Sequence, residues 1–370
     1  MSDNIKQYFS LRNEFFIKYD FDITKVPKSI LAIPFVVNIL PIAWALDAEL
    51  KITELDKNFY EHIKDIKSGY EIVHPKIKLG GKIKVKEVID NTYVPTNRVA
   101  QSFSGGVDSF NTLVNHINEK PKLVTVIGSD IFFDDKEGIK NLKNSTKEIA
   151  KQFRLEYCII ESNFRGFLNE HRLSNLVSLK INDGWWHGFQ HGIGLIGHIA
   201  PIAYKDGLKN FYFPSTFTKK EYEAKISCAS YPIIDESVHI ASTNIVHDGF
   251  EFTRQQKVKN LCYYVGGKTV KIPLRVCWQS RGGKNCSDCE KCFRTITAII
   301  AECFDPNEFG FNYTKTLAKK IEAIFKKQVL EKNDKVLIPL WRDIIVEANR
   351  NKDFINNNYP ELEWFLKEKI

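Results

Sequence analysis

The sequence predicts an α/β protein with a doubly wound parallel sheet, a zinc-binding module of four cysteines and a smaller N-terminal α+β domain. Between residues 99 and 216, short apolar strand-like segments alternate with longer helix-like ones, which is typical of a parallel sheet. A glycine-rich turn at residues 104–109 follows the first of these strands, where open parallel sheets bind phosphate groups. Four cysteines lie within residues 277–292, close enough in sequence to share one metal ion.

The first 95 residues are expected to form an accessory domain. The apolar stretch at residues 30–46 contains Pro34 and Pro41, so we expect it to form buried strands or a broken helix. Residues 58–67 have a helix-like pattern. Residues 76–89 alternate lysines with apolar side chains around two glycines, which predicts a hairpin that turns on Gly80 and Gly81.

The main domain is expected to span residues 96–310. The expected strands are residues 99–104, 122–131, 155–161 and 210–216, and the expected helices are residues 109–120, 136–153, 185–204 and 295–304. Residues 228–249 contain few periodic apolar positions and are expected to be mainly loop. Residues 311–370 alternate lysines with apolar side chains, which predicts a C-terminal extension of amphipathic surface helices.

The composition favours a folded protein that binds an anionic small molecule. Hydrophobic residues make up 43% of the 370 residues, so the chain can bury a full core and is not disordered. The formal net charge of +8 is too diffuse to indicate nucleic-acid binding. The N-terminus shows no signal peptide, and no apolar stretch reaches the roughly 20 residues of a membrane-spanning helix. We therefore expect a cytoplasmic protein with no membrane partner.

The glycine-rich turn is the most informative short segment. It reads Ser104, Gly105, Gly106, Val107, Asp108 and Ser109. The glycines let the backbone approach an anion closely, and the first amides of the following helix point at that anion. The two serines add hydroxyl donors, and the aspartate offers a carboxylate to a Mg²⁺ ion that bridges phosphates. The alternative is a glycine turn with an ordinary helix cap.

The cysteine cluster predicts a structural metal site. Cys277, Cys286, Cys289 and Cys292 follow one another at intervals of nine, three and three residues. Two-residue gaps let neighbouring thiolates reach one ion, and four thiolates complete a closed tetrahedral zinc site. An iron–sulfur cluster is one alternative, because four cysteines also hold such a cluster. Cysteines packed in the core without a ligand are another.

The turn resembles the pyrophosphate loop of the ATP-pyrophosphatase (PP-loop) superfamily. Members of this superfamily have an adenine-nucleotide α-hydrolase-like α/β fold and split ATP into AMP and pyrophosphate while they adenylate a substrate oxygen. The resemblance implies that residues 104–109 bind the pyrophosphate and its Mg²⁺, with Asp108 and Ser109 acting in catalysis. It gives Asp130, at the end of the second strand, a place in the nucleotide site, although an aspartate that merely ends a strand fits equally well.

The loop and the cysteines together resemble the 7-cyano-7-deazaguanine synthase (QueC) family over about residues 99–302. That family converts 7-carboxy-7-deazaguanine to its nitrile with ATP and ammonia, and holds a structural zinc on four cysteines. Tyr231, Pro232 and Asp235 are similar to its base-binding segment, although Ile233 and Ile234 intervene. The residues before the loop make the chain similar to extended QueC-like proteins of antiphage-defence operons, some of which join a deazaguanine carboxylate to a protein amine.

Further candidate residues are charged or aromatic side chains between the loop and the cysteines. Arg254, Lys257 and Arg275 are expected to neutralise the α-phosphate or the departing pyrophosphate, although each alone also fits a solvated surface charge. His191 lies four residues after His187 on one expected helix face, which favours packing or substrate contact over metal binding. Trp185, Trp186 and Trp278 are candidates to stack on a purine-like base, and buried packing is their alternative.

The sequence is also compatible with two other functions. Other PP-loop enzymes modify tRNA, by thiolation or by forming lysidine, and a thiolating enzyme commonly needs a cysteine pair apart from the zinc. Cys158, Cys228 and Cys262 form no close pair in the sequence. A nucleotide-binding scaffold subunit of a defence complex is the second alternative. The expected partners are ATP, a small carboxylate and a protein acceptor, and a homodimer is compatible with the resemblance.

Overall fold

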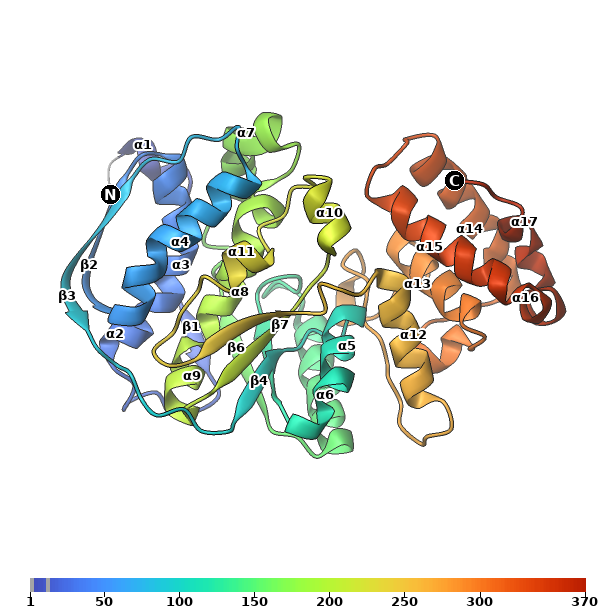
Figure 1. Cartoon of the computed structure of the whole chain (residues 1–370), viewed down its shortest axis with the longest axis horizontal. Helices are drawn as coiled ribbons and strands as arrows, with labels where there is room; N and C mark the ends of the chain where they lie inside the picture. The colour runs from blue at the N-terminus through green and yellow to red at the C-terminus, as the bar shows by residue number, and fades with distance from the viewer. Residues whose placement is uncertain (1–2, 11–13) are drawn as a thin grey trace.

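The computed structural model describes residues 3–10 and 14–370 and is organised around a six-stranded sheet (Figure 1). The strand order is β1-β6-β5-β4-β7-β8, and every neighbouring pair is parallel except β1 with β6. The strands are β1 (Ile17–Tyr19), β4 (Val99–Ser102), β5 (Lys122–Ile127), β6 (Tyr157–Ser162), β7 (Asn210–Pro214) and β8 (Asn244–Asp248). The predicted α/β class with a mostly parallel sheet is confirmed.

The chain changes direction across the sheet at β4. From β4 the chain runs through β5 to β6 on one side, and then returns to β7 and β8 on the other side. Ligands bind in the crevice at such a switch point, outside the carboxyl ends of the strands. The segment that leaves the carboxyl end of β4 is the glycine-rich turn, so the topology places this turn at the position where an α/β sheet binds its ligand.

Helices cover both faces of the sheet. One hydrophobic cluster joins Ala100, Val124 and Phe211 of the strands to the N-terminal helices and to α7–α9. The opposite face packs Leu123 against α5, α6, α12 and α13. The main-domain helices are α5 (Val107–Asn115), η1 (Ile117–Glu119), α6 (Lys136–Phe153), α7 (Glu170–Ile181), η2 (Trp186–Gln190), α8 (His191–Ile196), η3 (Gly197–Ile199), α9 (Ala200–Asp206), α10 (Lys219–Glu223), α11 (Pro232–Asp235), α12 (Arg254–Val265), η4 (Arg281–Gly283), α13 (Glu290–Ala301) and η5 (Pro306–Phe309).

The N-terminal elements pack directly on the sheet. They are α1 (Asp3–Lys6), α2 (Lys28–Leu31), α3 (Ile33–Ala45), β2 (Glu49–Asp56), α4 (Lys57–Val73) and β3 (Lys82–Ile89). Since β1 belongs to the central sheet and the helices share its hydrophobic core, this segment folds against the main domain. Buried strands or a broken helix were the two structures expected for the apolar stretch at residues 30–46. The broken helix is confirmed, since Ala32 separates α2 from α3.

The hairpin predicted at Gly80 and Gly81 is wrong, because β3 pairs with β2 in parallel. The two glycines are needed because the chain that leads into β3 passes very close to the C-terminal end of α3. A Cβ atom on Gly80 would lie 2.4 Å from Oδ1 of Asp47, and one on Gly81 would lie 2.4 Å from the carbonyl oxygen of Ala43. The Gly81 amide donates a hydrogen bond of 2.6 Å to that Asp47 oxygen. The glycine pair therefore marks a close packing contact and, at Gly81, a left-handed φ angle of +66°, but not a hairpin.

The segment at residues 228–249 holds more structure than its loop-like sequence indicates. It contains α11 and the edge strand β8, which pairs with β7 from Asn244 to Asp248. The strand β8 has only five residues, and the last two are His247 and Asp248. Its alternation of apolar and polar residues is therefore too short to predict a strand from the sequence.

The C-terminal residues form helices as expected and lie at the opposite end of the molecule from the N-terminal ones (Figure 1). They share one hydrophobic cluster with α5, α12 and α13 through residues such as Trp341 and Phe365. These helices are η6 (Lys315–Leu317), α14 (Ala318–Ile324), η7 (Phe325–Leu330), α15 (Leu337–Arg350), α16 (Lys352–Asn358), η8 (Pro360–Leu362) and α17 (Glu363–Leu366). Within the described residues, no helix is both long enough and apolar enough to span a membrane.

Candidate nucleotide site and metal centre

The N-terminus of α5 is open to a ligand. Gly106 is the N-cap residue, and no side chain of the described chain caps the helix. The amides of Val107, Asp108 and Ser109 donate no hydrogen bond to any described residue. Unpaired amides together with the positive end of the helix dipole form an anion-binding position, and these amides line a pocket at the carboxyl end of the sheet.

The two glycines of the turn serve different purposes. Gly105 has a φ angle of +76°, a left-handed conformation that favours glycine. Gly106 has a φ angle of −84°, and a Cβ atom there would come no closer than 3.5 Å to any neighbour outside its own turn. No described residue comes close enough to require glycine at residue 106, so the missing side chain leaves room for a ligand beside the amides.

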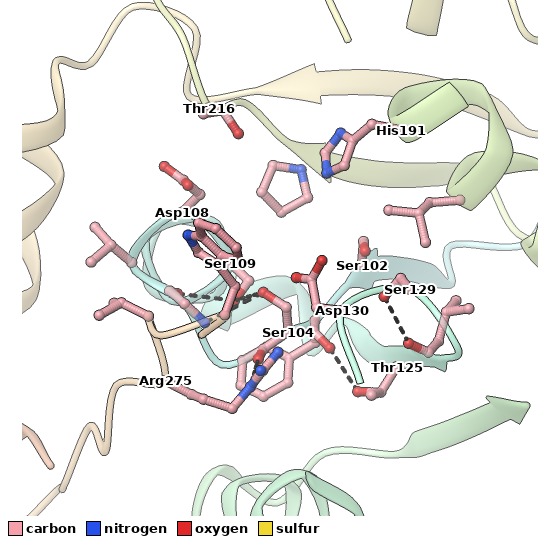
Figure 2. Close-up of a pocket in the computed structure, with 18 of the residues that line it drawn as sticks. Ser102, Ser104, Asp108, Ser109, Thr125, Ser129, Asp130, His191, Thr216 and Arg275 are labelled. Carbon is pink, nitrogen blue, oxygen red and sulfur yellow. Dashed lines mark hydrogen bonds between the residues drawn. The ribbon is translucent and has the colours of Figure 1, made fainter. Parts of the chain in front are cut away.

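Hydrogen bonds fix the shape of the turn (Figure 2). The Ser109 hydroxyl donates to the Gly106 carbonyl at 3.0 Å, and the Ser104 hydroxyl lies 3.5 Å from that of Ser109. Arg275, from the chain leading to the cysteines, donates its backbone amide to the Gly105 carbonyl at 2.7 Å and its Nε to the Ser104 carbonyl at 3.1 Å. The turn is thus preorganised and tied to the segment that carries the metal ligands.

Asp108 pairs with two cations of α12 beside the N-terminus of α5. Its Oδ2 lies 3.0 Å from Nη2 of Arg254, and its Oδ1 lies 3.1 Å from Nζ of Lys257. Lys257 is fully buried and also donates to the carbonyl of Ser215. Burial raises the pKa of the Asp108 carboxyl, but the two cations lower it more, so this pKa lies below its ordinary value. The carboxylate is ionised, and both of its oxygens are used within the protein.

Positive charge exceeds negative charge at this end of the pocket. Four cations lie around the turn, namely Arg254, Lys257, Arg275 and Lys291, and Asp108 is paired with the first two. Within the described residues, neither Arg275 nor Lys291 has a carboxylate at ion-pair distance, although Asp130 acts on both across the pocket. Burial lowers the pKa of all four cations. Four cations against two carboxylates leave an excess of about two positive charges, which a bound polyanion would relieve.

The other end of the pocket is aromatic and less charged. The rings of Trp186 and Phe213 lie 5.2 and 6.2 Å from the ring of His191, and all three line the pocket. Figure 2 shows Asp130 between His191 and the turn. Burial lowers the pKa of His191 to about 4, so the imidazole is neutral at pH 7, and its buried Nδ1 has no partner in the described chain. Asp130 is half-exposed and lies 3.8 Å from Arg165. A π-helical turn, η2, brings Trp186 to the pocket, and such turns cluster at functional sites.

The structure places the candidate base-binding residues outside this pocket. Tyr231 and Asp235 are buried, and neither they nor Pro232 line the cavity. The Tyr231 hydroxyl donates to the Ile226 carbonyl at 2.9 Å. Asp235 accepts a hydrogen bond of 2.6 Å from the Ser230 hydroxyl and lies 2.8 Å from Nδ1 of His247. In this structure the side chains of Tyr231 and Asp235 are thus held in the interior, where Oδ1 of Asp235 has no hydrogen-bond partner in the described chain.

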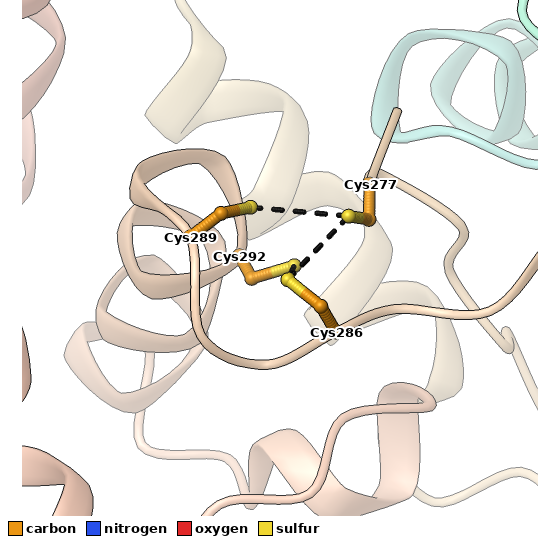
Figure 3. Close-up of side chains that lie close together, drawn as sticks. All are labelled: Cys277, Cys286, Cys289 and Cys292. Carbon is orange, nitrogen blue, oxygen red and sulfur yellow. Dashed lines mark hydrogen bonds between the residues drawn. The ribbon is translucent and has the colours of Figure 1, made fainter. Parts of the chain in front are cut away.

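The four cysteines come together as the spacing predicts (Figure 3). All four Sγ atoms lie within 4.8 Å of one another, and Sγ of Cys277 is 3.5 Å from that of Cys286 and 3.9 Å from that of Cys289. A tetrahedral zinc with Zn–S bonds of about 2.3 Å places its sulfurs roughly 3.8 Å apart. The cluster can therefore hold one metal ion such as zinc, and the sulfurs are too close together to enclose a cluster of several irons.

Backbone geometry supports a metal-binding role for the cysteines. The amides of Ser280 and Asp288 point at the sulfurs of Cys277 and Cys286, both at 3.4 Å. Such N–H···S contacts are the supporting interactions that orient metal ligands. Cys277 also lines the pocket at the turn, so the metal module forms one wall of the cavity.

Most of the predicted site residues converge on one pocket. The turn, Asp130, His191, Arg254 and Arg275 all line it, together with Trp186 and Trp278. Trp185 instead is fully buried and stacks on Phe189 at 5.0 Å. The sequence analysis missed Lys291 as a pocket residue, although its position between two metal ligands that flank a helix start was a usable signal.

Comparison of the chain with protein-family models, with curated proteins and with solved structures found no match in any of the three. The function is therefore argued from the site itself.

Proposed function

We propose that this protein is an ATP-dependent adenylating enzyme of the QueC type, which releases AMP and pyrophosphate and activates a carboxylate for attack by ammonia or an amine. The observation that carries the proposal is the uncapped N-terminus of α5 at the sheet's switch point, which shares its pocket with two cations, Arg275 and Lys291, that have no carboxylate at ion-pair distance in the described chain. The carboxylate of 7-carboxy-7-deazaguanine is the substrate that the sequence resemblance favours.

The β- and γ-phosphates of ATP are assigned to the turn. The amides of residues 107–109 and the hydroxyls of Ser104 and Ser109 donate hydrogen bonds to phosphate oxygens, and the open space at Gly106 admits them. Asp108 holds Arg254 and Lys257 beside these phosphates. Both oxygens of Asp108 are already paired, so Asp130 is the carboxylate better placed to bind the Mg²⁺ of Mg-ATP, whose charge offsets that of the phosphates.

The first reaction step joins the substrate carboxylate to AMP. A carboxylate oxygen attacks the α-phosphorus, the bond from that phosphorus to the bridging oxygen breaks, and pyrophosphate leaves with the electron pair. Negative charge grows on the transferred phosphoryl group and on the leaving oxygen, and Arg254 and Arg275 stabilise it. The protein contributes position and charge, and no side chain acts as a nucleophile.

The second step releases AMP. The nitrogen of ammonia or of an amine attacks the acyl carbon, the bond to the AMP oxygen breaks, and the nitrogen loses a proton to give an amide. A nitrile requires a second ATP, which adenylates the amide oxygen before elimination. The aromatic end of the pocket, with neutral His191 beside Trp186, suits a flat, uncharged ring attached to the carboxylate.

The test is product analysis with the purified protein. Mg-ATP is supplied with and without 7-carboxy-7-deazaguanine, with ammonia as acceptor, and AMP, pyrophosphate and the base are followed by mass spectrometry. Substrate-dependent AMP together with amide or nitrile supports the proposal, and AMP with no released base product points to a protein acceptor. ATP that is bound but never split favours the scaffold alternative, and AMP release that depends on tRNA favours the tRNA-modifying one.

A further inference from the structure

Lys291 is a cation of the pocket that forms no ion pair within the described chain. It is the second residue of α13 and lines the cavity together with Arg254 and Arg275. No carboxylate within residues 3–10 and 14–370 lies at ion-pair distance from its ammonium group, and no hydrogen-bond acceptor does either. A buried or half-buried charge without a partner is costly, so its retention here needs an explanation.

Two features of the protein disfavour a positive charge at Lys291, although Asp108 and Asp130 and a loaded four-thiolate metal site would offset part of their effect. The N-terminal turn of a helix carries the positive end of the helix dipole, which repels a lysine. Arg254 and Arg294 are close enough to repel it as well. Its sequence neighbour Glu290 is turned elsewhere, since Oε1 of Glu290 accepts hydrogen bonds from Nε of Arg294 at 2.8 Å and from Nε1 of Trp341 at 2.9 Å.

Lys291 lines the same pocket as the turn, Asp130 and His191. It is close enough to Asp108 and Asp130 for their charges to stabilise its ammonium group, and close enough to His191 to lower the pKa of that imidazole. When a nucleotide fills the pocket with its pyrophosphate on the turn and its reacting group toward His191, its α-phosphoryl group comes within reach of the walls that include Lys291.

We propose that Lys291 is a catalytic residue that binds the α-phosphoryl group of the nucleotide, and that the metal module is the device that positions it. This inference rests on the proposed function. Cys289 and Cys292 flank Lys291 in the first turn of α13, with Cys289 as its N-cap residue. Cys277 follows Arg275 by two residues, so the metal site fixes both cations that lack a carboxylate partner.

The test uses two simple probes, AMP and inorganic pyrophosphate, whose binding to the metal-loaded protein is measured by calorimetry in the presence of Mg²⁺. AMP retains the α-phosphoryl group, and pyrophosphate represents the group that leaves. Lys291→Met is compared with Lys284→Met, a lysine of the same module that is exposed and lies 3.9 Å from Glu137. Ser109→Ala serves as the matched change at the turn.

Lys291→Met is expected to weaken AMP binding about tenfold to a hundredfold, with pyrophosphate binding changed less than about twofold. Ser109→Ala is expected to give the reverse pattern, and Lys284→Met is expected to change neither affinity. Metal content and the circular dichroism spectrum should be unchanged in Lys291→Met, so that a loss of AMP binding reports the missing ammonium group and not a damaged metal module. A purely structural lysine would instead lower the metal content or the helix signal and leave the AMP affinity of the folded protein unchanged.

Unchanged AMP affinity in Lys291→Met, or a loss confined to pyrophosphate, would overturn the assignment. If the wild-type protein binds both probes but never splits ATP, the proposed function fails, while the comparison of variants still decides the role of Lys291. If the wild-type protein binds neither probe, both proposals fail together.

Discussion

Replacing Asp108 with asparagine should destabilise the protein strongly, even though the side chain keeps its size. The carboxylate lies 3.0 Å from Arg254 and 3.1 Å from Lys257, and the two cations are 13% and 1% exposed. At the effective dielectric constant of about 20 that suits such sites, each contact corresponds to roughly 5 kcal/mol of attraction before desolvation. Removal of one partner of a buried pair costs about 3–5 kcal/mol net, and here two cations lose the same partner.

The free energy of unfolding of Asp108→Asn, measured in urea at pH 7, should therefore fall by about 3–5 kcal/mol. The double variant Asp108→Asn with Lys257→Met removes the buried cation as well, so it should recover a large part of that loss. The coupling energy from this double-mutant cycle should be at least about 1 kcal/mol. A loss below about 1 kcal/mol, or a second substitution that adds further destabilisation, would refute the argument that Asp108 exists to neutralise these cations.

Three further predictions follow from the site and the core. Gly106→Ala should lower the free energy of unfolding by less than about 1 kcal/mol, because a Cβ atom there meets nothing closer than 3.5 Å. Calorimetry should nevertheless show that pyrophosphate binding is lost. Pyrophosphate binding at wild-type affinity would contradict the claim that the ligand occupies the space beside Gly106. Protein from which the metal has been removed by a chelator, and to which only Mg²⁺ is returned, should bind Mg-ATP at least about tenfold more weakly. Its helix and strand content, measured by circular dichroism, should be retained. An unchanged dissociation constant would show that the metal module does not shape the pocket. Burial lowers the pKa of His198 from 6.5 to about 4, so the unfolded chain takes up a proton at a higher pH than the folded protein does, and stability should fall by up to about 3 kcal/mol between pH 7 and pH 4. The non-titrating His198→Asn should reduce this slope, and identical pH profiles for the two proteins would exclude His198 as the cause.

The order of strands and helices around the turn could be predicted because each signal is local. A glycine pair between an apolar strand and a helix, and cysteines two residues apart, carry their meaning within a few residues. The Gly80–Gly81 pair shows the limit of that reasoning. Its glycines are required by a crossing with Ala43 and Asp47, more than thirty residues earlier in the chain, and no local pattern contains that contact.

The composition of the pocket shows the same limit. Asp108 looks like a magnesium ligand from its motif, but the fold brings Arg254 and Lys257 to it from about 150 residues away. The sequence does not distinguish Lys291 from the other lysines of the chain, and only the structure shows that it lines the pocket. Tyr231 and Asp235 match a motif by residue type, yet their surroundings decide that they pack in the interior.

The central claim is that the pocket splits ATP between its α- and β-phosphates. It is tested most directly by incubating the protein with ATP labelled at the α-phosphate, Mg²⁺ and a deazaguanine carboxylate, and separating the nucleotides by chromatography. The account predicts that the label appears as AMP, or as AMP joined to the product, and that Gly106→Ala abolishes this signal. Label recovered as ADP, or AMP formed equally well by Gly106→Ala, would contradict it.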